Sequence, residues 1–392
     1  MRILKISDVY FPRVNGVSTS IRTFSEEFTK SGHEVTLIAP RYPVEEEEEA
    51  AGIVRIPSRY LPMDPEDRMM HAKAIKRLLP EFKRRQFDVI HVHTPFVAHY
   101  LGLWLSRRLG IPVVESYHTY FEEYLDLYLP WLPRNLLRYV ARRFSRSQCN
   151  AVDVAIVPTR PMLDVLESYG VTGKIEILPT GIPSKTFSDG QGQWFRQEYG
   201  ITASREVLLY VGRVAYEKNI DFLIRVLARM VIRRPHILLV IAGEGPARED
   251  LIQQVQSAGL SDQVLFVGYL SRKHELANCY AAADIFVFAS NTETQGLVLL
   301  EAMQTGTPVV TTAVMGTAEI MRDGLGGLIA KEDVDDFAGK VDAVLSDESL
   351  RKRLMKEAHE KAQAWDAGLM AEKMLQLYDR QRSMHSHQDQ RL

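Results

Sequence analysis

The chain has 392 residues, of which 46% are hydrophobic and 25% charged, as expected for a globular protein with more than one domain. Its formal net charge of -2 argues against bulk binding to nucleic acid, and its two cysteines, Cys149 and Cys279, exclude a disulfide framework. No apolar run reaches the roughly 18 residues of a membrane span, and residues 1–11 lack the apolar core of a signal peptide. We therefore expect a cytoplasmic protein that can bind the inner face of the cell membrane only peripherally.

Strands and helices alternate through the first 180 residues. Apolar runs predict strands at residues 2–7, 34–39, 88–93, 112–117, 152–157 and 175–178. Helical composition between them predicts helices at residues 17–30, 68–85, 96–109 and 121–147, the last one broken by prolines. Five consecutive glutamates at residues 45–49 repel one another and predict a solvated loop.

A second alternating series follows residues 179–183, Pro-Thr-Gly-Ile-Pro, which we interpret as an interdomain hinge. Its predicted strands are residues 207–211, 237–242, 264–267, 285–288, a strand starting at 309, and 328–330. Its predicted helices are residues 218–234, 246–259, 273–282, 296–304, 334–345, 348–364 and 367–382. Two such series predict an α/β protein with two Rossmann-like, doubly wound domains, which we bound at residues 1–180 and 181–365.

The stretch from residue 284 to 312 carries the strongest functional signal. A buried parallel strand at residues 285–288 leads through a polar loop into a helix that begins at Gly296. Glu293 lies in the loop and Glu301 about two turns along the helix, so both can border the ligand crevice of an open parallel sheet. The spacing alone is weak, because 50 acidic residues supply about six such pairs by chance. The turn between the two carboxylates carries the signal, and an ordinary helix start is the structural alternative.

A second strand-to-helix turn, residues 211–219, contains two cations. Arg213 and Lys218 stand five residues apart beside a predicted helix N-terminus. Free N–H groups and positive charge at such a place suit a diphosphate. A surface arginine and a helix-start lysine are the structural alternative.

Other strand ends supply weaker candidates. Gly16 precedes the first long helix and lets the backbone approach a phosphate, although an ordinary turn would look the same. His118 stands at the carboxyl edge of the sheet, where it can touch a ligand or serve as a structural histidine. Topology alone adds three candidates near the nucleotide, Gly243, Gly245 and Tyr269. The spacing of His, Cys and acidic residues shows no closed metal site, and Asp333 is better explained as a helix cap. We predict neither a metal nor a cofactor.

Two of these motifs resemble a known family. Residues 292–310, TETQGLVLLEAMQTGTPVV, resemble the Glu-x7-Glu signature of retaining glycosyltransferases of family 4, which have the GT-B fold. Residues 211–219 are similar to the Gly-Arg-x4-Lys segment of that family. The resemblance spans nearly the whole chain. It implies two domains facing a central cleft, with the last helix crossing back, so that residues 366–392 join the first domain.

The resemblance also implies roles for the candidate residues. Arg213 and Lys218 would stabilise charge on the donor diphosphate, and His118 would contact the donor sugar. Glu301 would accept hydrogen bonds from the ribose, and Glu293 would face the sugar. Further donor contacts are expected from Thr294, Gly296 and Leu297.

Two features of the expected chemistry follow from comparison with the family. The family commonly has two glycines where this chain has Asn15-Gly16, which leaves the contact of this loop to the diphosphate open. Family enzymes retain the anomeric configuration. A double displacement needs a carboxylate nucleophile, and the candidate for it, Glu293, binds sugar hydroxyls in relatives. We therefore favour a front-face reaction in which the departing diphosphate helps to deprotonate the acceptor.

The acceptor is expected to contact a basic region of the first domain. Residues 68–146 hold 14 basic and 6 acidic side chains, and residues 124–147 mix aromatic side chains with arginines. An anionic bilayer attracts such a surface by about 1 kcal/mol per basic residue, although a solvated helix face is the structural alternative. Residues 116–133, SYHTYFEEYLDLYLPWLP, resemble bacterial diacylglycerol glucosyltransferases and, more loosely, phosphatidylinositol mannosyltransferases and sulfoquinovosyl lipid synthases. The predicted acceptor and membrane contacts are Tyr128, Trp131, Arg134, Arg138 and Arg142.

The sequence thus favours a metal-independent glycosyltransferase at a membrane surface, moving a hexose from a nucleotide-sugar such as UDP-glucose to a lipid such as diacylglycerol. Three alternatives stay open. They are a family 4 transferase with a soluble sugar or polysaccharide acceptor, a nucleotide-sugar epimerase of the same fold, and a non-catalytic sugar-nucleotide-binding protein. The joint presence of the two cations and two carboxylates argues against the last. The base, the sugar, the acceptor and the oligomeric state stay open at this point.

Overall fold

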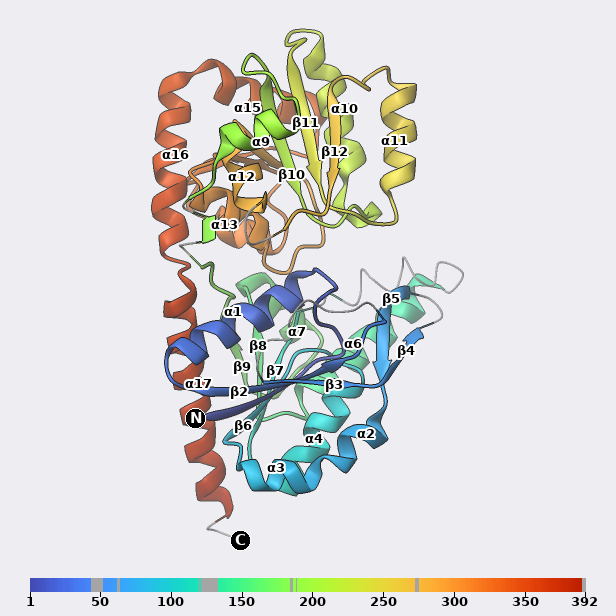
Figure 1. The fold of residues 1–392 in the computed structure, drawn as a ribbon, viewed down its shortest axis with the longest axis vertical. Coiled ribbons are helices and arrows are strands. Elements are labelled where there is room, and N and C mark those ends of the chain that lie inside the picture. Colours follow the sequence, from blue (N-terminus) through green and yellow to red (C-terminus); the bar gives the residue numbers. More distant parts are fainter. Residues whose placement is uncertain are drawn as a thin grey trace. The chain divides into compact units, whose positions relative to one another are not determined.

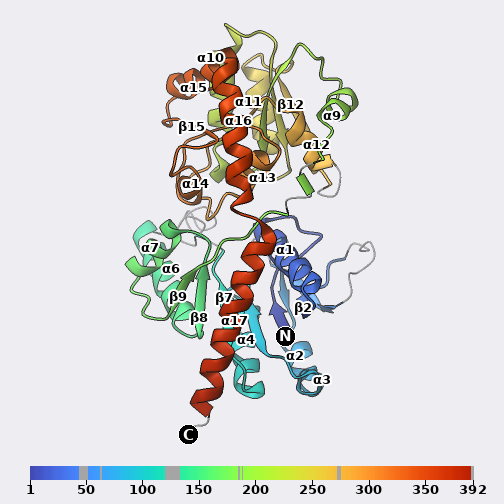
Figure 2. The same ribbon diagram turned by 90° about the vertical axis from the view of Figure 1, so that its left-hand side faces the viewer.

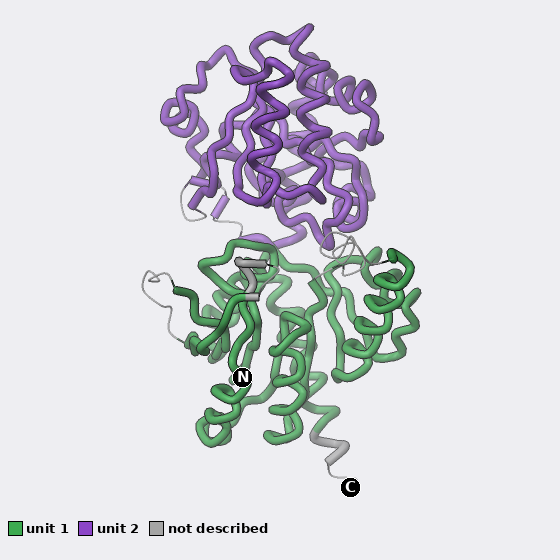
Figure 3. Tube along the Cα trace, turned by 90° about the vertical axis from the view of Figure 1, so that its right-hand side faces the viewer, with its two compact units in different colours: residues 1–181, 367–392 green, residues 182–366 purple. Residues whose placement is uncertain are grey.

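The computed structural model describes residues 1–43, 52–61, 64–118, 120, 133–183, 186–187, 189–271 and 275–389. The chain divides into two compact units (Figure 3). Unit 1 comprises Met1–Gly181 and Ala367–Leu392, and unit 2 comprises Ile182–Asp366. The two ends of unit 2 are neighbours, because the backbone N–H of Ile182 donates to the carbonyl of Trp365 over 2.8 Å and Ile182 forms a parallel bridge with Asp366.

Unit 1 is built on a parallel seven-stranded sheet (Figure 1). Its strands, in sheet order, are β3 (Ile53–Ile56), β2 (Glu34–Pro40), β1 (Arg2–Ile6), β6 (Val89–Val92), β7 (Val113–Ser116), β8 (Val154–Val157) and β9 (Ile175–Ile177). Both β6 and β7 are buried along their whole length, as strands covered by helices on both faces must be. From the central strands β1 and β6, the chain adds β2 and β3 on one side and β7, β8 and β9 on the other. This is the doubly wound arrangement expected from the sequence.

Helices connect and cover the strands of this sheet. They are α1 (Gly16–Lys30), α2 (Ala72–Arg77), α3 (Leu79–Arg85), α4 (Val97–Leu109), α6 (Arg134–Cys149), α7 (Arg160–Ser168) and α17 (Ala367–Asp389). The sequence patterns did not predict α7. They also ended the last helix at residue 382, whereas α17 continues to Asp389.

The single helix predicted over residues 68–85 is wrong. Residues up to Met70 belong to β5 (Asp64–Met70), which pairs antiparallel with β4 (Ser58–Leu61). Arg68 holds this hairpin together, because its Nε donates to Ser58 Oγ over 2.8 Å and its guanidinium lies over the Tyr60 ring. The remaining residues form the two short helices α2 and α3 rather than one, with a proline in the first turn of α3, where its missing N–H costs nothing.

The C-terminal helix α17 packs on unit 1 beside α1 (Figure 2). Its buried side chains recur at helical spacing and share a core with Phe24 and Phe28 of α1. They are Met370, Ala371, Met374, Leu377 and Tyr378. Each large apolar side chain so buried stabilises the contact by roughly 1.5–3 kcal/mol, and ion pairs of α17 with Glu176 and Asp88 flank it. The expectation that the last helix returns to the first domain is confirmed.

Unit 2 is built on a parallel six-stranded sheet. Its strands, in sheet order, are β12 (Val264–Gly268), β11 (Ile237–Ala242), β10 (Glu206–Val211), β13 (Ile285–Phe288), β14 (Val309–Thr311) and β15 (Gly327–Ile329). Every residue of β11 and of β13 is buried, so the core of unit 2 surrounds these strands. The two sheets confirm the predicted fold class, an α/β protein with two doubly wound halves.

The helical elements of unit 2 are α9 (Gly192–Glu198), η1 (Tyr216–Lys218), α10 (Ile220–Val231), α11 (Arg248–Ser257), α12 (Glu275–Ala282), α13 (Leu297–Gln304), α14 (Gly316–Ile320), α15 (Val334–Ser346) and α16 (Glu348–Gln363). The sequence patterns did not predict α9 or α14. Asp333 caps α15 by accepting a hydrogen bond from Asp336 N over 2.9 Å, as predicted.

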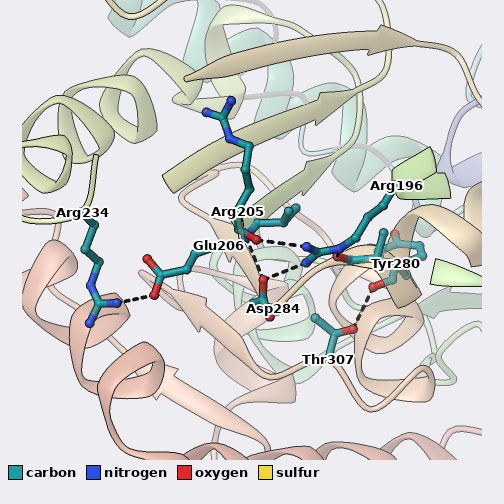
Figure 4. A network of polar contacts seen from close by, with 9 residues as sticks. Arg196, Arg205, Glu206, Arg234, Tyr280, Asp284 and Thr307 are labelled. Carbon is teal, nitrogen blue, oxygen red and sulfur yellow. Dashed lines mark hydrogen bonds and ion pairs between the residues drawn. The ribbon is translucent and has the colours of Figure 1, made fainter. Parts of the chain in front are cut away.

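A polar network ties α9 to the amino edge of this sheet (Figure 4). Arg196 of α9 donates from Nη2 to Asp284 Oδ2 over 2.9 Å, and Asp284 also accepts from the backbone N–H of Val207 in β10. At the same edge, Arg234 pairs with Glu206, as Figure 4 also shows. These contacts link β10 and β13 at the edge opposite their carboxyl ends, where the predicted site residues lie.

Candidate functional site

In unit 2 the loop after β13 is shaped by one glycine. Gly296 has a φ of +88°, in the left-handed region that favours glycine, and it forms the N-cap of α13. A Cβ built on it would lie 2.8 Å from Thr317 Cγ2, so a side chain is excluded as well. The structure therefore contains the strand, loop and helix that the sequence predicted here, with Glu293 in the loop and Glu301 on the helix.

The structure pairs two residues that the sequence assigned to different tasks. Lys218 Nζ donates to Glu293 Oε1 over 2.6 Å, and both side chains are mostly buried, with 13% and 21% of their area exposed. Lys218 ends the short turn η1, and Asn219 after it adopts φ +55° to begin α10. The carbonyl of Glu293 accepts from Gly316 N over 2.8 Å, which fixes the loop. A cation and a carboxylate thus share one place at the carboxyl edge of the sheet.

Arg213 lies on the same segment, between β10 and η1. Its carbonyl accepts a hydrogen bond from Tyr210 OH over 2.9 Å, which fixes the backbone five residues before Lys218. The side chain is half-buried. Both predicted diphosphate cations therefore come from the single connection that leaves β10.

The two glycines after β11 are required by the packing of neighbouring loops. A Cβ on Gly243 would lie 1.9 Å from the Gly212 carbonyl oxygen, and one on Gly245 would lie 2.3 Å from that of Val214. The loops after β10 and β11 therefore cross in backbone contact. Tyr269 follows β12 and is 53% exposed. The carboxyl ends of the four neighbouring strands thus carry all the donor residues predicted in unit 2.

Glu301 is buried in α13. Its Oε2 accepts a hydrogen bond from Tyr280 OH over 2.8 Å, and only 2% of the residue is exposed. Tyr280 of α12 is itself anchored, since its carbonyl accepts from Thr307 Oγ1 over 3.0 Å, as Figure 4 shows. Sequence reasoning missed Tyr280, whose contact joins helices that no local pattern relates.

A second group missed by the sequence analysis surrounds Glu332, which follows β15. Its Oε1 accepts from Asn219 Nδ2 over 2.8 Å and its Oε2 from Asn291 Nδ2 over 3.3 Å. Asn219 adjoins Lys218, and Asn291 lies on the loop of Glu293. One carboxylate therefore links the two segments that carry the ion pair.

In unit 1 the loop after β1 ends in a capped helix. Asn15 Oδ1 accepts from Ser18 N over 2.8 Å, which satisfies one of the free N–H groups at the start of α1. The asparagine that replaces the expected glycine therefore has a structural task. A Cβ on Gly16 would meet nothing within 4 Å, so packing within the described chain does not require this glycine.

His118 lies two residues beyond β7 and contacts a second histidine. Its Nε2 is 3.3 Å from Nδ1 of His93, and the two rings are nearly parallel, 5.7 Å apart. Burial lowers the pKa of His118 to about 4, so the ring is neutral at pH 7. His118 is thus a neutral hydrogen-bonding group at the carboxyl edge of its sheet.

Asp8 is the carboxylate at this edge of unit 1. It follows β1, is almost fully buried, and accepts from Thr94 Oγ1 and from Ala98 N at the start of α4. Burial raises the pKa of Asp8 to about 6 against the opposing effect of these hydrogen bonds. Its geometry is that of a helix cap supplied from another strand.

Two family models match the sequence. Glycosyltransferase Family 4 matches residues 14–185, and Glycosyl transferases group 1 matches residues 193–361. The alpha-monoglucosyldiacylglycerol synthase of Streptococcus pneumoniae (strain ATCC BAA-255 / R6) is 32% identical over 365 residues, which are 91% of this chain and 81% of that protein. The chain belongs to glycosyltransferase family 4. It is an enzyme, a hexosyltransferase, as the sequence motifs predicted.

Solved structures place this family 4 chain in the GT-B fold. Sucrose-phosphate synthase from Thermosynechococcus elongatus superposes with a TM-score of 0.79 at 21% identity, over 97% of this chain and 99% of that one. HepE of Anabaena, solved in complex with UDP-glucose, gives a TM-score of 0.76 at 16% identity, over 97% and 99%. At these identities the likeness establishes the fold.

The acceptor residues predicted for this family 4 enzyme fall partly outside the described residues, since Tyr128 and Trp131 lie there. Arg134, Arg138 and Arg142 are exposed on α6, and Arg142 lies over the Tyr169 ring. Sequence reasoning missed the apolar side chains exposed on the same helix. They are Leu136, Tyr139 and Val140, with 49%, 61% and 48% exposed.

In the described part of the chain, no helix is long and apolar enough to cross a bilayer. Those residues also contain no group of three or more His, Cys, Asp or Glu side chains that could hold a metal ion.

Proposed function

We propose that this chain transfers a hexose, glucose in the first instance, from a nucleotide-sugar such as UDP-glucose to a membrane lipid such as diacylglycerol, with retention of configuration and without a metal. The observation that carries the proposal is the pair of Lys218 and Glu293 at the carboxyl edge of unit 2, on the connection that also carries Arg213. Likeness to a synthase named for glucosyldiacylglycerol supports the choice of sugar and acceptor.

The donor half of the proposal rests on charge. A diphosphate brings negative charge to the place where Lys218 already meets a carboxylate, so the lysine would turn from Glu293 toward the diphosphate or be shared between the two. Arg213 would add a second cation, and Glu293 would then be available to the sugar hydroxyls. Stabilising charge on the leaving diphosphate is the largest catalytic contribution we assign to this protein.

The role assigned to Glu293 also bears on the mechanism of retention. A carboxylate nucleophile needs an oxygen directed at the anomeric carbon, whereas Glu293 is assigned here to the sugar hydroxyls. This favours a front-face reaction. In it the bond from the anomeric carbon to the diphosphate breaks, the acceptor oxygen bonds to the same face, and the acceptor proton passes to the departing phosphate oxygen. His118, as a neutral ring, would hydrogen-bond the sugar.

The acceptor half of the proposal rests on α6. Leu136, Tyr139, Val140 and Arg143 recur at spacings of three and four, so they share one exposed face of the helix. Exposed apolar side chains beside arginines are typical of helices that lie in the interface of an anionic bilayer. We propose that this face brings the enzyme to the membrane that holds its acceptor, as a peripheral protein.

The test measures nucleotide release from UDP-, GDP- and ADP-sugars, with and without diacylglycerol in vesicles of anionic or zwitterionic lipid. Release that requires one donor together with diacylglycerol, is faster on anionic vesicles and disappears in Lys218→Ala would support the proposal. The coupling constant of the anomeric proton in the product gives the configuration of the new glycosidic bond. Release without any response to lipid would be hydrolysis of the donor and would leave a soluble acceptor as the better account, and conversion of the donor to another sugar without an acceptor indicates an epimerase.

A matched pair of variants tests the membrane surface separately. The double variant Leu136→Ser, Tyr139→Ser should lose flotation with anionic vesicles, while Ile232→Ser, which removes an exposed apolar side chain from unit 2, should keep it. Equal flotation of both variants would overturn the role of α6 and leave the donor chemistry untouched.

A further inference from the structure

A row of buried hydrogen-bonding side chains in unit 1 ends at His118. The chemistry proposed above uses His118 but none of the other side chains in the row. His91 and His93 lie two residues apart on β6 and its end, so their side chains point to the same face of the sheet. Both are buried, with 1% and 2% exposed. Histidines at such positions need an explanation, because buried polar groups require partners.

The row is continuous from the C-terminal helix to His118. The ring of His91 hydrogen-bonds through Nδ1 to Tyr378 OH of α17 and through Nε2 to Ser116 Oγ of β7, the latter over 2.8 Å. The His91 ring lies 4.0 Å from the His93 ring, and Nδ1 of His93 contacts Nε2 of His118. The ring of His91, which its own hydrogen bonds hold in place, thus packs against one side of His93. On the other side, His93 contacts His118.

All three imidazoles are neutral at pH 7. Burial lowers the pKa of His91 and His93 well below the ordinary value and that of His118 to about 4, and Lys5, the register partner of His91, acts in the same direction when it is protonated. A neutral imidazole has one N–H donor and one acceptor nitrogen. At the contact between His93 and His118, one ring therefore donates and the other accepts.

The other nitrogen of His93 decides which ring donates. Among the described residues, Nε2 of His93 is buried without a hydrogen-bond partner. A buried N–H without a partner is rarer in proteins and more costly than a bare acceptor. The lower-energy arrangement leaves Nε2 without a proton, so His93 carries its proton on Nδ1 and donates it to Nε2 of His118. The proton of His118 then resides on its Nδ1.

We propose that His93 is a positioning residue, held by His91 and Tyr378, that fixes the orientation of His118 and keeps its proton on Nδ1. The catalytic consequence rests on the proposed function, in which His118 hydrogen-bonds the donor sugar. His118 then meets the sugar as a donor through Nδ1–H, a preference that the hydrogen bond on its other nitrogen imposes.

The proposal is tested first without activity, by long-range 1H–15N correlation on 15N-histidine-labelled protein at pH 7.5. The signal of His118 is assigned by its absence in His118→Asn. We expect a protonated Nδ1 and an unprotonated Nε2 in the wild-type protein. His93→Leu should move the proton to Nε2, whereas His93→Asn should preserve the wild-type pattern, because its amide can donate from the position of Nδ1.

A matched pair of tyrosine variants tests the support from α17. Tyr378→Phe removes the phenol that contacts His91, and Tyr117→Phe removes a buried phenol bonded to Ser145 Oγ over 2.7 Å outside the row. Only Tyr378→Phe should shift the signals of His93 and His118. A proton on Nε2 of His118 in the wild-type protein, or an unchanged pattern in His93→Leu, would overturn the proposal.

Steady-state rates then separate this proposal from the proposed function. His93→Leu should lower kcat for transfer by about tenfold or more while leaving the KM of the donor within about threefold, and His93→Asn should recover most of the loss. If no donor and lipid react, the proposed function fails while the NMR result stands. If transfer proceeds but the proton of His118 is on Nε2, the role of His93 fails alone.

Discussion

The two units place different chemistry at the same topological position. Each has its candidate site residues at the carboxyl edge of a parallel sheet, yet unit 1 presents neutral histidines and unit 2 presents an ion pair. The difference does not come from the architecture, which is shared. It comes from burial and from the partners available to each group, so the chemistry of such an edge must be argued from its side chains.

Two lysines make this contrast concrete. Lys5 of β1 is fully buried, and its Nζ donates to the Ile21 carbonyl and to Ser25 Oγ over 3.2 and 3.1 Å. Burial lowers the pKa of Lys5 to about 7. Lys218 in unit 2 keeps part of its surface exposed and faces a carboxylate, which favours its charged form. The two lysines thus differ in their surroundings, since burial disfavours the charge of Lys5 and a carboxylate accompanies Lys218.

The largest expected effect concerns the charged edge of unit 2. Lys218→Ala should lower kcat by about 100- to 1000-fold, because it removes a cation from the leaving diphosphate. Nucleotide release in the presence of the lipid acceptor measures it. Lys352→Ala, which removes an exposed lysine from α16, should leave the rate unchanged. A loss below tenfold in Lys218→Ala would break the assignment of this lysine to the diphosphate.

Glycines provide the second test of the contrast. Gly243→Ala should destabilise unit 2 by about 3 kcal/mol, because the added Cβ meets the Gly212 carbonyl at 1.9 Å. Gly16→Ala should change the stability of unit 1 by less than about 0.5 kcal/mol, since its Cβ would enter open space. Urea unfolding followed by hydrogen exchange of peptides from each unit measures both. Lower activity of Gly16→Ala at unchanged stability would indicate close approach of a ligand.

The third expected effect is a pH dependence of the free energy of unfolding that arises from Lys5 in unit 1. Folded Lys5 loses its proton near pH 7, whereas unfolded lysine keeps it to about pH 10.5, so between these values the unfolded state binds more protons and stability rises with pH. From pH 7 to pH 9 this should add about 2 kcal/mol to the free energy of unfolding. In Lys5→Met that increment should vanish. Equal slopes in the variant and the wild-type protein would show that Lys5 is charged in the folded protein.

The smallest expected effect is common to the two units. Asn15→Ala and Asp333→Ala each remove the side chain that caps a helix, α1 in unit 1 and α15 in unit 2. Each should lower the stability of its own unit by about 1 kcal/mol. Hydrogen exchange at the first turn of each helix measures this loss of stability. A much larger loss in Asn15→Ala would mean that Asn15 supports the loop after β1 beyond its role as a cap.

Local sequence patterns predicted the structural features that depend on residues close together in the chain. The strand, the loop and the start of the helix around Glu293 could be predicted because an apolar run, a polar loop and Gly296 follow one another. The cap at Asp333 is local in the same way. The single helix over residues 68–85 failed because most of the residues of β5 are charged or polar, so strand alternation was hidden until the structure showed its partner β4.

Contacts between distant segments could not be predicted from these patterns. Lys218 and Glu293 were both candidates, yet their ion pair joins residues 75 positions apart. The hydrogen bond from His91 to Tyr378 spans 287 positions, and the support of Glu301 by Tyr280 joins two helices. Such contacts arise from the winding of the sheets and from the return of α17, which periodicity does not encode.

The adjacent ends of unit 2 make it a domain insertion. Because Ile182 and Asp366 form a bridge, a genetic cut at these two points removes one continuous piece whose own termini already meet. The remaining segments of unit 1 end within reach of a short linker. Sortase or intein ligation at these junctions would therefore allow one unit to be labelled with isotopes while the other is not, so that the NMR signals of the labelled unit are read without overlap from the other.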